Sequence, residues 1–161
     1  MPSFSIRVIA LSISCALALA VGAQASSYKL EIKHYDHRLQ SHACDARDNA
    51  KQASDSDAEA KYNGQADGLS AASNHLHTHG FNIPPASCPP SVKSNRKKVS
   101  FPFKDELSWQ RKQYCKARQF GKEAPDNAAY YSGYAGGMKQ ARTWLGKIFS
   151  NQGGKVPKLS C

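Results

Sequence analysis

One segment of this chain occurs twice, and this repetition constrains the fold more than any other feature of the sequence. Residues 60–72 read AKYNGQADGLSAA and residues 129–141 read AYYSGYAGGMKQA, with the same alanines, tyrosine and glycines in register. Two flanking blocks recur in the same order. Cys44-Asp45-Ala46-Arg47 returns as Cys115-Lys116-Ala117-Arg118, and Gly80 to Cys88 returns as Gly153 to Cys161. Self-similarity at a fixed offset indicates repeated structural units, so we predict a tandem duplication.

The spacing of apolar residues around these blocks predicts helices. We expect an all-α fold of two tandem-duplicated helical hairpins packed about a pseudo-two-fold axis. A unit of about 60 residues buries little surface by itself, which favours a shared interface. Ser56-Asp57-Ala58-Glu59 has the form of a capping box, and Gly153-Gly154 is expected to end the last helix. The expected elements are a short extended arm at Tyr28–Tyr35 and helices at His37–Ala53, Ser56–His79, Asp105–Gln119 and Asp126–Ser150.

Small residues form a stripe along each copy of the repeated helix. They recur at every fourth position, which places them on one helical face. A glycine inside a helix costs about 1 kcal/mol relative to alanine, so two glycines in each helix require a reason. We predict that the stripes face each other, with Tyr62 and Tyr131 beside the contact; a groove for an extended ligand or an inserted loop is the alternative. The stripes are Ala60, Gly64, Gly68 and Ala72, and Ala129, Gly133, Gly137 and Ala141.

The amino-terminal segment has the pattern of a secretory signal peptide. Arg7 precedes an apolar run from Val8 to Val21, and Ala23-Gln24-Ala25 offers small residues for cleavage. We therefore expect a signal peptide at 1–25 and a periplasmic or secreted product without a membrane span. The remaining chain divides into a first helical repeat at 26–90, a basic linker at 91–100 and a second helical repeat at 101–161.

Four cysteines remain after the signal peptide: Cys44, Cys88, Cys115 and Cys161. An even number in an exported chain predicts disulfides. The duplication favours Cys44–Cys88 and Cys115–Cys161, which give each repeat one disulfide. The pairing Cys44–Cys115 with Cys88–Cys161 keeps the same symmetry and is the alternative.

Positive charge is concentrated in the second half of the chain. Residues 28–90 contain six Lys or Arg and eight Asp or Glu, whereas residues 91–161 contain fifteen and four. Such a basic region is typical of proteins that bind anionic polymers, although a solvated linker has the same composition. Arg47 and Arg118 each follow a cysteine by three residues, and we expect them to cap local carbonyl groups or to bind an anion of a partner. The candidate basic patch is Lys93, Arg96, Lys97, Lys98, Arg111 and Lys112.

A histidine cluster ends the first copy of the repeated helix. His75 and His79 are four residues apart and share one helical face, so together they would bind one metal ion. His34 and His37 would complete such a site. The second copy has no histidines at the matching positions, so we favour a solvated helix end and expect no cofactor. No nucleophile elbow, phosphate loop or paired-carboxylate motif is found, so we do not expect an enzyme.

One part of the first repeat resembles a known family. The run Tyr62-x-Gly64-x-x-Asp67-Gly68, followed by Ile83-Pro84 and Cys88-Pro89, resembles the Rap/Tai immunity proteins of type VI secretion. The resemblance covers Cys44 to Cys88. It implies a small exported helical protein with a disulfide, which binds and blocks a peptidoglycan-degrading amidase.

These observations predict an exported bacterial protein that binds rather than catalyses. We expect its partner to be another protein, and the role to be that of an inhibitor or immunity protein for a cell-wall-active enzyme. The alternatives are a basic envelope protein that binds an anionic polymer, and a periplasmic metal binder that uses His75 and His79.

Overall fold

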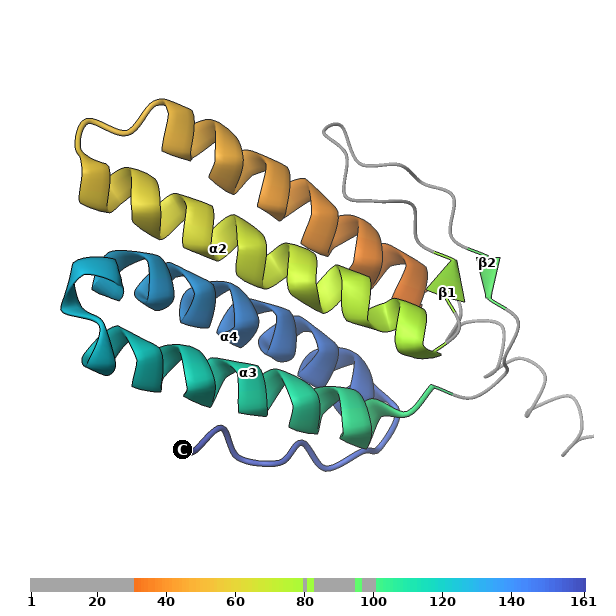
Figure 1. The fold of residues 1–161 in the computed structure, drawn as a ribbon. Coiled ribbons are helices and arrows are strands. Elements are labelled where there is room, and N and C mark those ends of the chain that lie inside the picture. The colour runs from red at the N-terminus through yellow and green to blue at the C-terminus, as the bar shows by residue number, and fades with distance from the viewer. Residues whose placement is uncertain (1–30, 80, 83–94, 97–100) are drawn as a thin grey trace, which may run out of the picture.

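The structure, a computed structural model, describes residues 31–79, 81–82, 95–96 and 101–161. Within these residues the chain is almost entirely helical, which confirms the all-α prediction (Figure 1). The expected signal peptide and most of the expected linker lie outside the described residues. The elements are a first helix over residues 31–51, α2 (Ser56–His75), η1 (Leu76–His79), β1 (Phe81–Asn82), β2 (Asn95–Arg96), α3 (Phe103–Glu123), η2 (Pro125–Asn127) and α4 (Ala128–Asn151).

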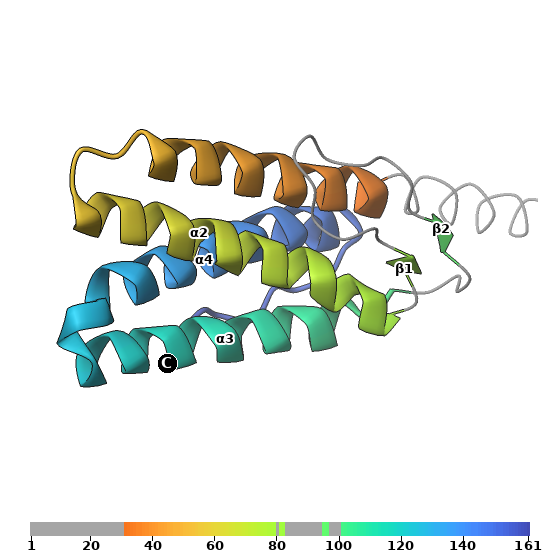
Figure 2. The same ribbon diagram turned by 45° about the horizontal axis from the view of Figure 1, so that its top comes forward.

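The helices form an elongated bundle with α2 and α4 in the middle. The first helix and α3 lie on either side of this pair, as both views show (Figures 1 and 2). The strands β1 and β2 form a short antiparallel pair that joins Phe81 to Arg96. The apolar core runs between the helices, and its largest fully buried members are Ile32, Leu39, Leu69, Leu76, Leu107, Met138 and Leu145.

The prediction of an extended arm at Tyr28–Tyr35 is wrong for its described part, because residues 31–35 are helical. Ile32, Tyr35 and Leu39 are all buried, with exposed fractions of 0%, 2% and 0%. Their spacing of three and four residues is helical. The alternation of Leu30 and Ile32 with charged residues was too short to distinguish a strand from the first turn of an amphipathic helix.

The start of α2 and the end of α4 follow the prediction, whereas α3 is longer at both ends than the predicted Asp105–Gln119. Helix α2 begins at Ser56 as predicted, but the Oδ1 atom of Asp55 accepts the hydrogen bond from the Ala58 amide at 2.7 Å. Asp126, where the last helix was expected to begin, lies within the 3₁₀ turn η2, and the N-cap residue of α4, Asn127, makes no side-chain capping bond. The end of α4 confirms the prediction, since Gly153 has a φ of 78° and its amide donates to the Ser150 carbonyl.

The glycine stripes of α2 and α4 face each other, as the sequence predicted. A Cβ atom added to Gly64 would overlap the Tyr130 carbonyl, and one added to Gly133 would overlap the Lys61 carbonyl. One turn further along, added Cβ atoms at Gly68 and Gly137 would lie 2.5 Å from the carbonyl oxygens of Tyr134 and Gln65, respectively. The two backbones therefore touch directly, and glycine is required because a side chain would separate them.

The side chains next to the glycine stripes differ in burial. Leu69 and Met138, which occupy equivalent positions in the two copies, are both fully buried, and Tyr62 and Tyr131 are half-buried. The ring of Tyr131 also lies against Phe120 of α3, with 5.5 Å between the ring centroids.

A disulfide fastens the carboxyl-terminal segment to α3. Cys115 and Cys161 are bonded, with 5.5 Å between their Cα atoms, which confirms the favoured pairing for the second half and excludes the alternative one. Cys44 is also disulfide-bonded, and its partner lies outside the described residues. The buried guanidinium of Arg142 donates to the carbonyls of Leu107 and Pro157, and so holds the same segment against α3 and α4.

Substitution of the contact glycines tests whether the close approach holds the bundle together. Gly64→Ala and Gly133→Ala are each expected to lower the free energy of unfolding by about 3 kcal/mol, because the new methyl group forces α2 and α4 apart. Urea unfolding followed by circular dichroism measures this change.

Gly136→Ala is the matched control, since a Cβ atom at this exposed position of α4 meets nothing within 4 Å. It is expected to raise the free energy of unfolding by up to about 1 kcal/mol through helix propensity. Equal losses of unfolding free energy in Gly64→Ala, Gly133→Ala and Gly136→Ala would show that the α2–α4 contact does not require glycine.

Candidate functional site

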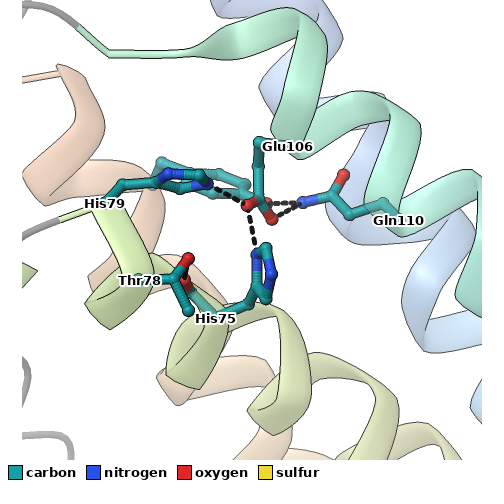
Figure 3. Close-up of polar contacts among 6 residues, drawn as sticks. His75, Thr78, His79, Glu106 and Gln110 are labelled. Carbon is teal, nitrogen blue, oxygen red and sulfur yellow. Dashed lines mark hydrogen bonds and ion pairs between the residues drawn. The ribbon is translucent and has the colours of Figure 1, made fainter.

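Among the described residues, two histidines and a glutamate converge where the end of α2 meets the beginning of α3. His75 is the last residue of α2, and His79 ends the 3₁₀ turn η1 that continues it. Glu106 and Gln110 lie one turn apart on α3. Figure 3 shows both imidazole rings and the Gln110 amide directed at the carboxylate of Glu106.

Both histidines contact the same carboxylate oxygen. The Nδ1 atom of His75 lies 2.6 Å from Oε2 of Glu106, and the Nε2 atom of His79 lies 3.0 Å from it. The potential ligand atoms of the three residues all lie within 4.8 Å of one another. A ligand set of two imidazole nitrogens and one carboxylate oxygen is therefore already assembled, and the ligands come from two separate helical segments.

Aromatic residues shield this cluster from water. Glu106 is fully buried, while the side chains of His75 and His79 are 20% and 14% exposed. The ring of Trp109 stacks on His75 with 3.7 Å between the centroids, and the rings of Phe101 and His79 form a T-shaped pair with 5.5 Å between the centroids. A carboxylate in such surroundings requires compensation by hydrogen bonds or a cation, because its burial as an unpaired charge is costly.

A second layer of polar groups fixes the orientation of the carboxylate. The Nε2 atom of Gln110 donates to Oε1 of Glu106 at 2.8 Å and to the Tyr35 hydroxyl at 2.9 Å. Thr78 donates to the backbone carbonyl of His75 at 2.7 Å. Outer partners of this kind orient the ligands of metal sites in proteins. The Oε1 atom of Gln110 is buried and has no hydrogen-bond partner within the described part of the chain.

Tyr35 connects the cluster to the first helix. Burial raises the pKa of Tyr35 well above its ordinary value of 10.0, the negative charge of Glu106 raises it further, and the hydrogen bond with Gln110 acts in the opposite direction. Its neighbour Asp36 is also buried, and accepts hydrogen bonds from Ser73 at 2.6 Å and Gln40 at 3.1 Å. The fully protonated phenol is therefore part of the polar layer behind the site.

The cluster of His75, His79 and Glu106 allows two alternative states, one with protons and one with a metal ion at its centre. Protons on the two ring nitrogens would satisfy Glu106 through hydrogen bonds. Alternatively, neutral imidazoles and the carboxylate would bind one divalent cation, for which two His and one Glu are a recurrent ligand set with zinc.

The structure changes the predicted composition of this site. His75 and His79 lie together as the helical spacing suggested, and both are half-buried rather than solvated. His34 and His37 are exposed on the first helix and do not belong to the cluster of ligand atoms that includes His75 and His79. Glu106 was not predicted from the sequence. Its position next to Leu107 and one turn before Gln110, on the inward face of α3, was the available signal.

The predicted basic patch is only partly described. Arg111 and Lys112 are exposed on α3, and Arg96 lies in β2 opposite Phe81, while Lys93, Lys97 and Lys98 lie outside the described residues. No ion pair is formed between a Lys or Arg of residues 101–161 and any carboxylate that the structure describes.

Among the helices that the structure describes, none has the length and apolar character needed to cross a bilayer.

No protein-family model, curated protein or solved structure matches the chain. The resemblance to the Rap/Tai immunity proteins and the role that it implies stay predictions. The residues that carry the resemblance have structural contacts here: Gly64 and Gly68 pack against α4, and Asp67 accepts a hydrogen bond from the Tyr130 hydroxyl at 2.9 Å.

The raised pKa of Tyr35 predicts how stability depends on alkaline pH. The folded state favours the neutral phenol, so this contribution is complete below about pH 10, where the unfolded tyrosine titrates, and is lost as pH rises further. Tyr35→Phe is expected to reduce the loss of unfolding free energy above pH 10 by up to about 1.4 kcal/mol per pH unit. Urea unfolding at a series of pH values from 9 to 11 measures it. Parallel curves for the two proteins would contradict the assignment.

Proposed function

We propose that this is an exported protein that binds a divalent transition metal through His75 Nδ1, His79 Nε2 and Glu106 Oε2. The observation that supports the proposal is the convergence of these ligand atoms, all within 4.8 Å of one another around a fully buried carboxylate. This is the third of the functions considered from the sequence, with Glu106 as the ligand that was missing.

The chemistry of the ligands favours zinc among the common cations. Imidazole nitrogen suits zinc, copper and nickel, whereas calcium and magnesium prefer sites made of oxygen ligands. Zinc is bound at about 2.0–2.2 Å by histidine and carboxylate ligands. The separations of 2.6 Å and 3.0 Å between the ligand atoms require only a small opening of the cluster for a metal to replace the hydrogen bonds.

The position of the site gives the metal a structural consequence. His75 and His79 belong to the first half of the chain and Glu106 to the second, so a bound ion would connect the two halves. A ligand that binds only the folded state stabilises it in proportion to the logarithm of its free concentration. Zinc would therefore raise the melting temperature.

The same proposal includes the tandem duplication of the fold. The repeated blocks of sequence and the reciprocal contacts of Gly64 and Gly133 support two helical hairpins related by a pseudo-two-fold axis. The disulfide Cys115–Cys161 supports an equivalent Cys44–Cys88 disulfide in the first hairpin. The metal site interrupts this symmetry, because Ile148, Ser150 and Gln152 replace the histidines in the second copy.

Calorimetric titration of zinc into the mature protein tests the proposal. We expect one equivalent to bind and to raise the melting temperature. Glu106→Gln is expected to weaken binding by at least about 100-fold, since even outer-layer partners of metal ligands contribute up to this factor. His37→Gln serves as the matched control, because His37 is exposed and lies outside the cluster. The zinc affinity of this variant should equal that of the wild type.

Two results would refute metal binding at this site. One is a wild-type protein whose melting temperature zinc does not change. The other is equal zinc affinity in Glu106→Gln and wild type, when circular dichroism shows that both proteins are folded.

A further inference from the structure

Arg47 and Arg118 occupy matching positions in the two halves of the chain, but their side chains have different partners. In the first half, the Nη2 atom of Arg47 lies 3.8 Å from Oδ1 of Asp67 and donates to the Ser70 hydroxyl at 3.1 Å. The arginine is on the first helix and the aspartate on α2, so the pair joins the two helices. The chain therefore supplies its own carboxylate to this guanidinium.

In the second half the carboxylate is missing. Arg118 of α3 matches Arg47 in the repeated Cys-x-Ala-Arg block, and Gly136 of α4 matches Asp67 in the repeated helix. Arg118 instead donates to the Tyr114 hydroxyl at 3.3 Å and lies over its ring, 5.9 Å from the centroid. It forms no ion pair with any described carboxylate.

A cavity occupies the place of the missing side chain. It has a volume of about 400 Å³, lies between α3 and α4, and is lined by Arg118, Lys122, Tyr114, Tyr131, Gly121 and Gly136 among others. A Cβ atom added to Gly136 would meet nothing within 4 Å, so the glycine leaves this side of the cavity open. Both cations come from α3 at a spacing of four residues and therefore share one face of the helix.

We propose that this cavity is a binding site for a carboxylate carried on a peptide, that is, for an Asp or Glu side chain of a partner protein. The ligand chemistry follows from the first half of the chain, where the matching arginine takes an aspartate. Guanidinium and carboxylate are complementary in charge and in their planar geometry, and the Lys122 ammonium adds a second positive charge. The tyrosine rings provide apolar surface for the stem of the ligand side chain.

This site is independent of the proposed metal site. Glu106 lies near the beginning of α3 and Arg118 near its end, so the two sites are separated along the helix. Failure of one proposal therefore does not affect the other.

The test uses the amide of N-acetyl-aspartate as probe and N-acetyl-asparagine amide as its uncharged match. Titration of each into the isotopically labelled mature protein is followed by NMR of the Arg118 side chain and the Gly121 and Gly136 amides. We expect saturable shifts with the aspartate probe alone. Inorganic phosphate is titrated in a separate arm, and tighter binding of phosphate than of the carboxylate would overturn the assignment of ligand class.

Exchange of the two matching positions sharpens the test. Gly136→Asp gives the second half the carboxylate of the first half, and is expected to weaken probe binding by at least about tenfold because the new side chain pairs with Arg118. Asp67→Gly opens the corresponding place beside Arg47, and is expected to create a second binding site there. Equal shifts from both probes, or unchanged affinity in Gly136→Asp, would overturn the proposal.

Discussion

The direct contact between the backbones of α2 and α4 is the interaction on which the rest of the structure depends. Gly64, Gly68, Gly133 and Gly137 make it possible, because a Cβ atom at any of them would lie no more than 2.5 Å from a carbonyl oxygen of the opposite helix. The short distance between the helix axes lets Leu69 and Met138 reach a common core, which the first helix and α3 close from either side. Each glycine costs helix stability, and the packing that it permits offsets this cost.

The position of the candidate metal site depends on this contact between α2 and α4. Because α2 is fixed against α4, and α4 is packed against α3, the last residues of the α2 segment meet the beginning of α3 at a defined place. There His75 and His79 contact one carboxylate oxygen of Glu106, and Gln110 donates to the other. The buried carboxylate requires positive charge or donated protons at this point, and the two imidazoles supply either the protons or the other ligands of a cation.

Features that depend on local sequence could be predicted well. Helical periodicity, the glycine at position 153 and the spacing of the repeated stripes determine the helices and the α2–α4 contact without knowledge of the remaining chain. The repeat also indicated the Cys115–Cys161 pairing. In contrast, the extended arm was wrong because a few alternating residues fit both a strand and an amphipathic helix.

The site itself could be predicted only in part, for a physical reason. The spacing of His75 and His79 is a property of one helix, so the sequence revealed their shared face. Their contact with Glu106 is a property of the packing between segments 27 and 31 residues apart, and no local pattern encodes it. The same holds for Arg118, whose missing partner became apparent only when the contact of Arg47 with Asp67 was known.

The most direct test of metal binding by His75, His79 and Glu106 is the anomalous scattering of a zinc-soaked crystal of the mature protein. We expect one strong peak within bonding distance, about 2.0–2.2 Å, of His75 Nδ1, His79 Nε2 and Glu106 Oε2 together. A map in which these three side chains keep their direct hydrogen bonds, while zinc is found only on exposed histidines such as His34 or His37, would contradict it.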